Sequence, residues 1–340
     1  MRVLVTGGAG FIGSHLCRLL LEKEYSVSVI DSLTYAGNKD NLAGFESLGT
    51  FSFYEGQIQD APLVSRILGE QKIEAIIDTA AETHNDRSLL SATAFLDTNI
   101  QGVYTLLEAT KDHDLRRILH VSTDEVYGSI VEGEFTEDSP LEPNTPYSAS
   151  KAAGDLLCRA HYVSYKTPVV ITRGGNTYGP NQYPEKLVSL SLVRLLRGKR
   201  IPVYGEGAQR REWIHVRDHA AGILTAFEKG SDGEVYNISD TNERENRWIV
   251  TRLLERLNLS EELVKRIPDP REGAHDFRYS MSSGKLRQLG WRPEVSFEAG
   301  LNDTIDWYRD NPSWWESTIA DANYQEFMRR FYGKALGDDL

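Results

Sequence analysis

A glycine-rich turn near the N-terminus constrains the fold of this chain more than any other feature. Residues 2–6 form a short apolar run typical of a buried strand, and Gly7, Gly10 and Gly13 follow it at a spacing of three. Apolar residues over 12–20 then recur one helical turn apart. Because glycine allows a tight turn and a close approach of the backbone to phosphate, a strand, turn and helix in this order are typical of a dinucleotide site in a parallel α/β sheet.

A second apolar run, residues 26–30, ends at Asp31, which lies 18 residues beyond Gly13. A carboxylate at this place accepts hydrogen bonds from the adenosine ribose hydroxyls and repels a 2′-phosphate. We therefore predict NAD rather than NADP, the alternative being a structural aspartate at a strand end.

Strand and helix patterns alternate up to about residue 173. Apolar runs predict further strands at residues 51–55, 73–79, 118–122 and 169–173. Helical spacing predicts two long helices at residues 91–112 and 146–165. The alternation predicts an α/β chain with a Rossmann-type doubly wound parallel sheet. We expect this NAD-binding domain, with the catalytic residues, to span 1–175.

The alternation degrades after Arg173. Short strand patterns mix with helical ones near 187–197, 216–229, 246–257 and 297–311, which predicts a smaller, mixed α/β, partly interleaved lobe over 176–315, followed by a tail at 316–340. This lobe carries a basic and aromatic set that suits a pyrophosphate and a nucleobase, namely Lys186, Tyr204, Arg210, Arg211, Arg271, His275 and Arg278. Scattered surface charges are the alternative.

Two stretches carry the chemistry. Residues 122–128 (Ser-Thr-Asp-Glu-Val-Tyr-Gly) follow an apolar strand pattern, and Tyr147 and Lys151 lie one helical turn apart. In a doubly wound sheet the carboxyl end of a strand faces the ligand crevice. We expect Lys151 and a positively charged nicotinamide to lower the pKa of Tyr147, so that Tyr147 removes a proton from a sugar hydroxyl as hydride leaves the same carbon.

Asp124 and Glu125 exceed what a simple dehydrogenase needs. Oxidation at C4 of a hexose acidifies the proton at C5, so one carboxylate can take that proton while one carboxylic acid protonates the departing C6 hydroxyl. The two groups must then hold opposite protonation states. A capping aspartate beside an exposed glutamate is the alternative interpretation.

Charge and cysteine content limit the partners and the compartment. A net charge of −12 argues against nucleic acid or an anionic membrane surface as a partner, and no apolar stretch approaches the roughly 20 residues of a membrane span. The only cysteines, Cys17 and Cys158, have no metal-type spacing. We expect a cytoplasmic protein without a metal site.

The glycine spacing resembles the short-chain dehydrogenase/reductase superfamily. Over residues 1–315 the chain resembles the nucleotide-sugar 4,6-dehydratases, most closely those acting on dTDP-glucose. The stretches that carry this resemblance are 7–13, 31–38, 80–88, 122–128, 147–151, 176–180, 184–187 and Tyr204 with 211–213. The Thr-Asp-Glu run discriminates, because related epimerases and decarboxylases generally have a serine-centred run without the aspartate.

The resemblance implies roles for individual residues. Tyr147 with Lys151 would oxidise C4, Thr123 would bond the C4 oxygen, Asp124 would expel the C6 hydroxyl and Glu125 would take the C5 proton. NAD would be tightly bound and would be regenerated within each reaction cycle. It would contact Gly7, Gly10, Phe11, Ile12, Gly13, Asp31, Ser32, Leu33, Thr34, Gln57, Ile58, Thr79, Ala80, Ala81, Thr98, Tyr147, Lys151 and Thr177. The nucleotide sugar would contact Thr83, Thr123, Glu125, Asn176, Lys186, Leu187, Pro202, Tyr204, Arg211, Asn246, Arg271 and His275. Family members are usually homodimers through two long helices, here 91–112 and 146–165.

Several positions depart from the family pattern. Gln57 stands where an aspartate is usual, Asn85 replaces an apolar residue, residues 174–177 replace a bulkier run, and the segment 271–275 is one residue longer. These departures leave open the same chemistry on a UDP-sugar such as UDP-GlcNAc or UDP-glucose, admitted by space at the glycines, or release of a 5,6-unsaturated product. A nucleotide-sugar 4-epimerase is a further alternative, and a non-catalytic dinucleotide-binding regulator would be expected to have lost Tyr147 or Lys151.

Overall fold

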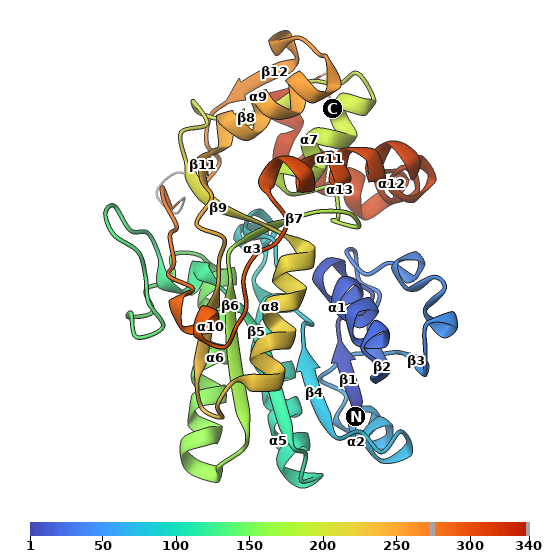
Figure 1. Ribbon diagram of the computed structural model, residues 1–340. Coiled ribbons are helices and arrows are strands. Elements are labelled where there is room, and N and C mark those ends of the chain that lie inside the picture. Colours follow the sequence, from blue (N-terminus) through green and yellow to red (C-terminus); the bar gives the residue numbers. More distant parts are fainter. Residues whose placement is uncertain (272–275, 338–340) are drawn as a thin grey trace.

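A seven-stranded parallel sheet forms the centre of the larger lobe (Figure 1). The computed structural model describes residues 1–271 and 276–337. The strand order is β10-β6-β5-β4-β1-β2-β3, and the strands are β1 (Arg2–Thr6), β2 (Ser26–Asp31), β3 (Phe51–Glu55), β4 (Ala75–Asp78), β5 (Arg117–Thr123), β6 (Val169–Gly174) and β10 (Val235–Ile238). The order reverses between β1 and β4, which confirms the doubly wound Rossmann-type sheet and places a ligand crevice at that reversal.

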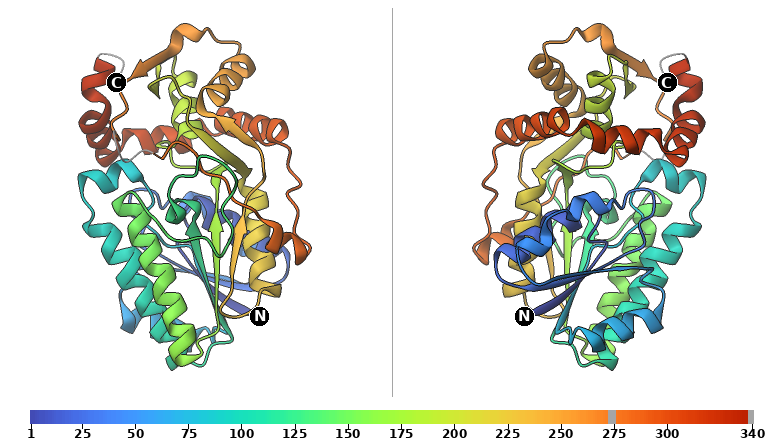
Figure 2. Two further views of the ribbon diagram at one scale, coloured as in Figure 1. Left: turned by 90° about the vertical axis from the view of Figure 1, so that its left-hand side faces the viewer. Right: turned by 90° about the vertical axis from the view of Figure 1, so that its right-hand side faces the viewer.

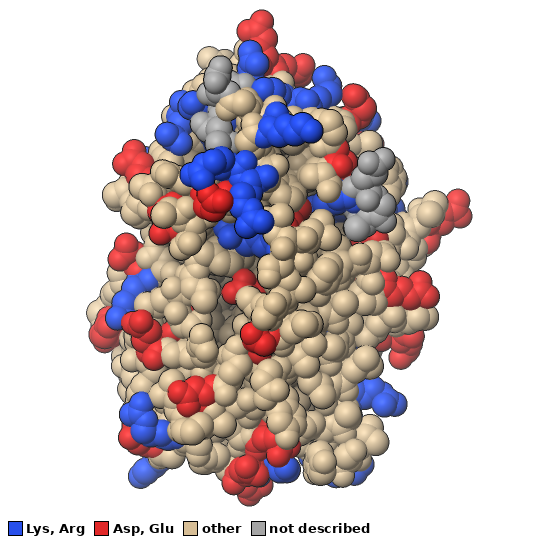
Figure 3. Space-filling model, turned by 180° about the vertical axis from the view of Figure 1, so that it is seen from behind, with Lys and Arg blue, Asp and Glu red and all other residues tan. Residues whose placement is uncertain are grey.

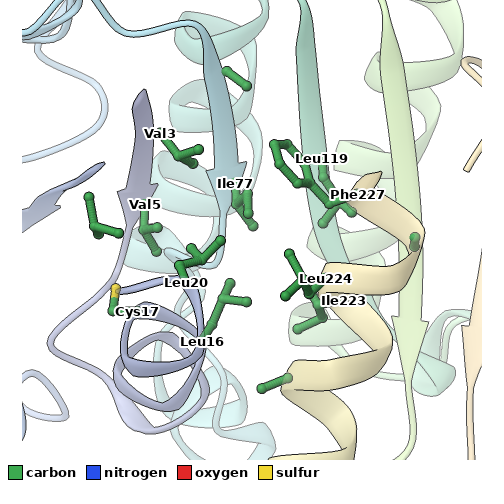
Figure 4. Close-up of a cluster of buried hydrophobic side chains, with 14 of the residues drawn as sticks. Val3, Val5, Leu16, Cys17, Leu20, Ile77, Leu119, Ile223, Leu224 and Phe227 are labelled. Atoms are coloured by element: carbon green, nitrogen blue, oxygen red, sulfur yellow. The ribbon is translucent and has the colours of Figure 1, made fainter. Parts of the chain in front are cut away.

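Helices cover both faces of this sheet (Figure 2). One face carries α1 (Phe11–Glu22) and α8 (Val216–Lys229), and the other carries α2 (Ala61–Glu70), α5 (Val103–Asp112) and α6 (Pro146–Tyr165). Apolar side chains of α1 and α8 meet those of β1, β4 and β5 in a fully buried cluster that includes Leu16, Leu20, Ile77, Leu119 and Ile223 (Figure 4). Close packing here fixes the glycine turn against the sheet.

The chain returns to the first sheet after the boundary expected near residue 175. Strand β10 pairs in parallel with β6, with Val235 opposite Ile171, and α8 packs against α1. The two lobes therefore interleave, because the edge of the dinucleotide sheet is completed by residues that follow part of the second lobe.

The long helix expected over 91–112 has a different form. Ser91 is extended, with φ −162° and ψ 126°, so the helix begins as α4 (Thr93–Leu96). It then widens into a π-helix, η3 (Asp97–Gly102), before α5. The other long helix, α6, has the predicted bounds, because Thr145 caps it and Pro146 occupies its first turn.

The second lobe is smaller and mixed. A three-stranded sheet of β7 (Asn176–Tyr178), β9 (Arg210–His215) and β11 (Glu243–Glu245) lies beside the parallel pair β8 (Ile201–Tyr204) and β12 (Val264–Ile267). Helices α7 (Leu187–Leu196), α9 (Asn246–Leu257) and α11 (Phe297–Asp310) share a core around Leu192, Ile249, Leu253, Leu301 and Tyr308. Shorter elements are α3 (Asn85–Leu90), α10 (Gly284–Gln288) and the 3₁₀ turns η1 (Lys39–Leu42), η2 (Phe45–Ser47), η4 (Asp124–Tyr127) and η5 (Glu261–Leu263).

Two helices follow α11 and pack on the molecule. They are α12 (Pro312–Ala320) and α13 (Ala322–Leu336). Phe327, Met328 and Tyr332 of α13 are buried in one cluster with Tyr183 and Leu190. Within the described chain, no helix combines the length and the apolar character needed to cross a membrane.

Candidate active site

A cavity of about 720 Å³ lies at the carboxyl ends of the central strands and continues into the second lobe. Its walls include the glycine turn, the carboxyl run of η4, Tyr147 of α6 and residues of β8, β9 and α9. Most of the predicted site residues line it. Two exceptions are Leu33 and Lys151, and His275 lies outside the described residues.

The glycine turn is shaped as a dinucleotide site requires. Gly7 has φ +65°, a left-handed conformation that favours glycine. A Cβ at Gly13 would lie 2.2 Å from the Gly7 carbonyl oxygen, so a side chain there would force the turn open. Gly10 begins α1 without a side-chain cap, which leaves first-turn amides of that helix to meet an anion. The turn therefore fits a pyrophosphate.

Asp31 lines the cavity at the end of β2, as predicted. Its oxygens accept hydrogen bonds from the backbone amides of Ala9, at 2.9 Å, and Leu33, at 2.8 Å. Burial raises the pKa of this carboxyl, while these amides oppose the rise. A carboxylate has room for further donors, so Asp31 can also accept ribose hydroxyls. Leu33 has φ +47° and packs against the main core, outside the cavity wall, so its contact with the cofactor stays a prediction.

The two carboxyls of η4 have different surroundings. Asp124 is 4% exposed. Burial, and then the charge of Glu125, raise its pKa to about 8. The Thr123 hydroxyl donates to Asp124 Oδ1 at 3.1 Å. Glu125 is only partly buried, and its Oε2 accepts a hydrogen bond of 2.6 Å from Asn85. Near neutral pH the Asp124 carboxyl therefore carries a proton.

Tyr147 lies on the cavity wall, on the first turn of α6. Burial, and then the charge of Glu125, raise its pKa well above the ordinary value of a tyrosine. In the protein alone the pKa of Tyr147 is therefore raised, and the predicted lowering by Lys151 together with a positively charged nicotinamide stays a prediction. A positively charged ring beside the phenol would still favour the phenolate.

Lys151 lies behind the cavity wall and is 2% exposed. Its Nζ donates to the Val121 carbonyl at 2.8 Å and is 3.4 Å from His120 Nε2. Burial lowers the pKa of Lys151, while the charges of Asp78 and Asp155 oppose this. The lysine is thus held by the end of β5.

A buried polar network continues beneath Lys151, and the sequence analysis missed it. His120 Nδ1 lies 2.7 Å from Asp78 Oδ2, and Asp78 also accepts the Thr6 hydroxyl at 2.6 Å. Arg173 donates to Asp155 at 2.8 Å on the other side. The apolar runs in the sequence had predicted only buried strands here. Polar residues that meet in the fold but lie far apart in the chain leave no local pattern.

Asn99, in the π-helix, is fully buried behind the cavity wall. Its side chain both accepts from the Glu82 amide and donates to the Glu82 carbonyl, each at 3.0 Å, and it donates to Ser150 at 2.9 Å. Asn99 therefore joins the strand end after β4 to helix α6. Thr98, from the same turn, lines the cavity as predicted.

The second-lobe end of the cavity carries the expected cations. Lys186 donates to the Thr83 carbonyl at 2.8 Å, and Arg271 forms an ion pair with Asp86. Tyr204 donates to the same aspartate at 3.0 Å. The other predicted substrate residues that line the cavity are Asn176, Leu187, Pro202, Arg211 and Asn246.

Two aromatic side chains that line the cavity, Tyr332 and His219, were not among the predicted site residues. The hydroxyls of Tyr332 and Tyr204 lie 2.7 Å apart, and both side chains line the cavity. His219, from α8, hydrogen-bonds Thr177 at 2.6 Å. A Cβ at Gly174 would lie within 2.4 Å of the His219 ring, so this imidazole fills the space expected beside Gly174.

Several buried polar atoms at the cavity lack a partner within the described structure. They are His84 Nδ1, Ser122 Oγ, Gln209 Oε1, Trp213 Nε1, His219 Nε2 and Asn246 Oδ1. Unpaired buried polar atoms are costly, so these groups suit a polar ligand. Among the described residues, no group of three or more His, Cys, Asp or Glu side chains is arranged to hold a metal ion.

Comparisons with known proteins agree with this geometry. The model of the family described as GDP-mannose 4,6 dehydratase matches residues 4–304. A dTDP-glucose 4,6-dehydratase from Streptomyces niveus is 47% identical over 323 residues, which cover 93% of this chain and 95% of that protein. The structure of a dTDP-glucose 4,6-dehydratase from Streptomyces venezuelae, solved with NAD bound, has a TM-score of 0.90 at 48% identity and covers 94% of this chain and 100% of its own.

A related enzyme class lies further away. A UDP-glucose 4-epimerase from Thermotoga maritima has a TM-score of 0.85 at 31% identity, covering 92% of this chain and 100% of its own. The predicted resemblance to the nucleotide-sugar 4,6-dehydratases is confirmed. Because the family model spans both lobes and the relatives cover nearly the whole chain, this protein is a member of the GDP-mannose 4,6 dehydratase family.

Proposed function

We propose that this protein is an NAD-dependent hydro-lyase that converts dTDP-glucose to dTDP-4-dehydro-6-deoxyglucose. The observation that carries the proposal is the pair of adjacent carboxyls at the cavity. Asp124 is buried and holds a proton near neutral pH, whereas Glu125 is partly exposed and accepts the Asn85 amide. One group can therefore act as an acid and the other as a base, as elimination of water requires.

The residues divide the reaction between them. Tyr147 takes the proton of the C4 hydroxyl, and the Thr123 hydroxyl bonds the C4 oxygen. Glu125 then removes the C5 proton, and Asp124 gives its proton to the C6 hydroxyl, which leaves as water. When bound, NAD supplies a hydride acceptor for C4, a hydride donor for C6 and the positive charge that favours the Tyr147 phenolate.

The relatives support dTDP-glucose as the substrate. The similar proteins from Streptomyces niveus and Streptomyces venezuelae are both named dTDP-glucose 4,6-dehydratases, at 47% and 48% identity. The epimerase relative is only 31% identical. An epimerase has no use for a carboxylic acid poised beside a carboxylate, and His219 occupies the space at Gly174 that was expected to admit a bulkier sugar.

Assay of the purified protein with dTDP-, UDP-, CDP- and GDP-hexoses tests this function. We expect dTDP-glucose to lose one water without an added reductant, with solvent deuterium at C5 and the hydride returned to C6. A product of unchanged mass would indicate epimerisation and refute the proposal. An unsaturated product without hydride at C6 would show that the cycle stops after elimination.

We also propose a homodimer through one side of the larger lobe. Large apolar side chains are exposed along α3 to α6, namely Leu89, Leu90, Leu96, Tyr104, Leu156, Val163 and Tyr165. Figure 3, which views the molecule from this side, shows a broad area of few charges right of centre. Because exposed apolar groups gathered on one face mark protein contacts, a second copy of this chain suits this face.

We propose that residues 1–175 hold most of the NAD contacts and residues 176–315 most of the sugar contacts, with Thr83, Thr123 and Glu125 also reaching the sugar and Thr177 reaching NAD. Strand β10 and helix α8 follow residue 175 but complete the dinucleotide sheet. Both cysteines are free and buried, which accords with the proposed location in the reducing cytoplasm.

A further inference from the structure

Asn85 lies beside the carboxylate to which the proposed reaction assigns the C5 proton. It is the first residue of α3, and it is 6% exposed. Its Nδ2 donates to Glu125 Oε2 at 2.6 Å. The sequence resemblance implied an apolar residue at this position, which could not make this bond.

The orientation of the Asn85 amide is determined by its other neighbour. Thr145 caps α6, and its Oγ1 accepts a hydrogen bond from the Ser148 amide at 3.1 Å. The Thr145 hydroxyl donates to Asn85 Oδ1 at 2.8 Å. With Oδ1 used as an acceptor, the NH₂ group must face Glu125, whose carboxylate can only accept.

These bonds connect three separate segments. Asn85 belongs to α3, Glu125 belongs to η4 and Thr145 begins the helix that carries Tyr147. The carboxylate of Glu125 is therefore fixed relative to the helix of the oxidation step. A partly exposed glutamate without such a partner would sample several rotamers.

We propose that Asn85 is a positioning residue for the elimination step. It holds Oε2 of Glu125, so that Oε1 is left to receive the C5 proton. As that C–H bond breaks, the C5–C6 double bond forms and the C6–O bond breaks, with the proton of Asp124 completing water. The inference rests on the proposed function, and it assigns Asn85 to elimination rather than to oxidation at C4.

Single-turnover measurements on Asn85→Leu test the assignment. Leucine has nearly the shape of asparagine but lacks the amide. With dTDP-glucose we expect elimination, followed by rapid quench as loss of water from the enzyme-bound sugar, to slow about tenfold, as loss of a hydrogen bond to a charged group predicts. The rate at which the enzyme's NAD is reduced should stay within about threefold of the wild-type rate. Because elimination is then the slower step, the absorbance of the reduced nicotinamide should persist during turnover.

Thr145 supplies an independent pair of variants. Thr145→Val removes the hydroxyl that orients the amide and should shift the ratio of the two rates in the same direction, whereas Thr145→Ser keeps the hydroxyl and should restore the ratio. Melting temperature and bound NAD content establish that each variant is folded. If Asn85→Leu does not fold, the Thr145 pair decides.

The outcomes separate two failures. A wild-type protein that neither reduces its NAD nor releases water with dTDP-glucose would refute the proposed function and this inference with it. A wild-type protein that turns over normally, with an unchanged ratio of elimination to oxidation in Asn85→Leu and in Thr145→Val, would refute the role of Asn85 alone. Equal slowing of both steps would show a general structural role and would also refute it.

Discussion

Replacing Asp124 by asparagine removes the proton that the proposed elimination needs. The amide has nearly the same size and can still meet the Thr123 hydroxyl, which lies 3.1 Å from Asp124 Oδ1. It cannot give a proton to the C6 hydroxyl. We therefore expect the variant to oxidise C4 and then stall.

The magnitude follows from the role and the surroundings of the group. With a pKa of about 8, about nine in ten molecules carry the Asp124 proton at pH 7. General acid catalysis contributes about 10²- to 10⁴-fold, so elimination should slow by that factor in Asp124→Asn. In the wild type, elimination should fall about tenfold per pH unit above pH 8 as the proton is lost.

Stability should change in the opposite direction. The pKa of Asp124 is raised on folding, so the unfolded chain releases a proton that the folded chain keeps. The resulting penalty is absent below about pH 4, grows with rising pH and levels off above about pH 8. At pH 7 it is on the order of 4 kcal/mol, and asparagine, which has no charge to lose, avoids it. We expect Asp124→Asn to unfold at higher urea concentration than wild type at pH 7, with the difference disappearing near pH 4.

Stopped-flow absorbance and product mass check this reasoning together. The variant should accumulate reduced nicotinamide after dTDP-glucose is added, with little loss of water. A variant that forms the 4-keto-6-deoxy sugar at the wild-type rate would refute the assignment of Asp124 as the acid. A variant less stable than wild type at pH 7 would refute the burial argument.

Three other substitutions test separate parts of the structure. Gly13→Ala should weaken NAD binding about tenfold, measured by titration of the apoprotein, because its Cβ would lie 2.2 Å from the Gly7 oxygen. Tyr332→Phe should raise KM for dTDP-glucose about fivefold and leave kcat nearly unchanged, because it removes the hydroxyl 2.7 Å from Tyr204 at the second-lobe end of the cavity. Leu156→Glu should give a monomer by light scattering, because Leu156 is 57% exposed on the proposed dimer face; a dimer that persists would refute that face.

The sheet and its glycine turn could be predicted because their signals are local. Strands β1 and β3 and helices α6, α8 and α9 have the predicted bounds. Their apolar periods lie within each segment, glycine follows both strands, and side chains cap α6 and α8. Other features depend on partners far along the chain. Strand β10 joins the first sheet only because β6 offers an open edge.

The position of the C-terminal tail, which contributes a residue to the site, also could not be predicted from the sequence. Its aromatic residues, among them Phe327, Phe331 and Tyr332, did not indicate where the tail lies. In the structure, α13 buries Phe327 and Met328 between the two lobes, where Phe327 also contacts His84 and Arg87, and Tyr332 of the same helix lines the cavity. No local pattern specifies that placement, because it depends on the shape left by Tyr183 and Leu190.

The division of labour within η4 also depends on distant residues. Asp124 and Glu125 are adjacent and chemically alike, so their order in the sequence cannot say which one holds the proton. In the fold, burial raises the pKa of Asp124 against the opposing charge of Arg211. Glu125 faces Asn85, which comes from a helix 40 residues earlier. The same Asp-Glu pair on a chain without Asn85 would still offer an acid, but its base would have to be oriented by other means. The ratio of the elimination rate to the oxidation rate is therefore more sensitive to this part of the structure than overall activity is.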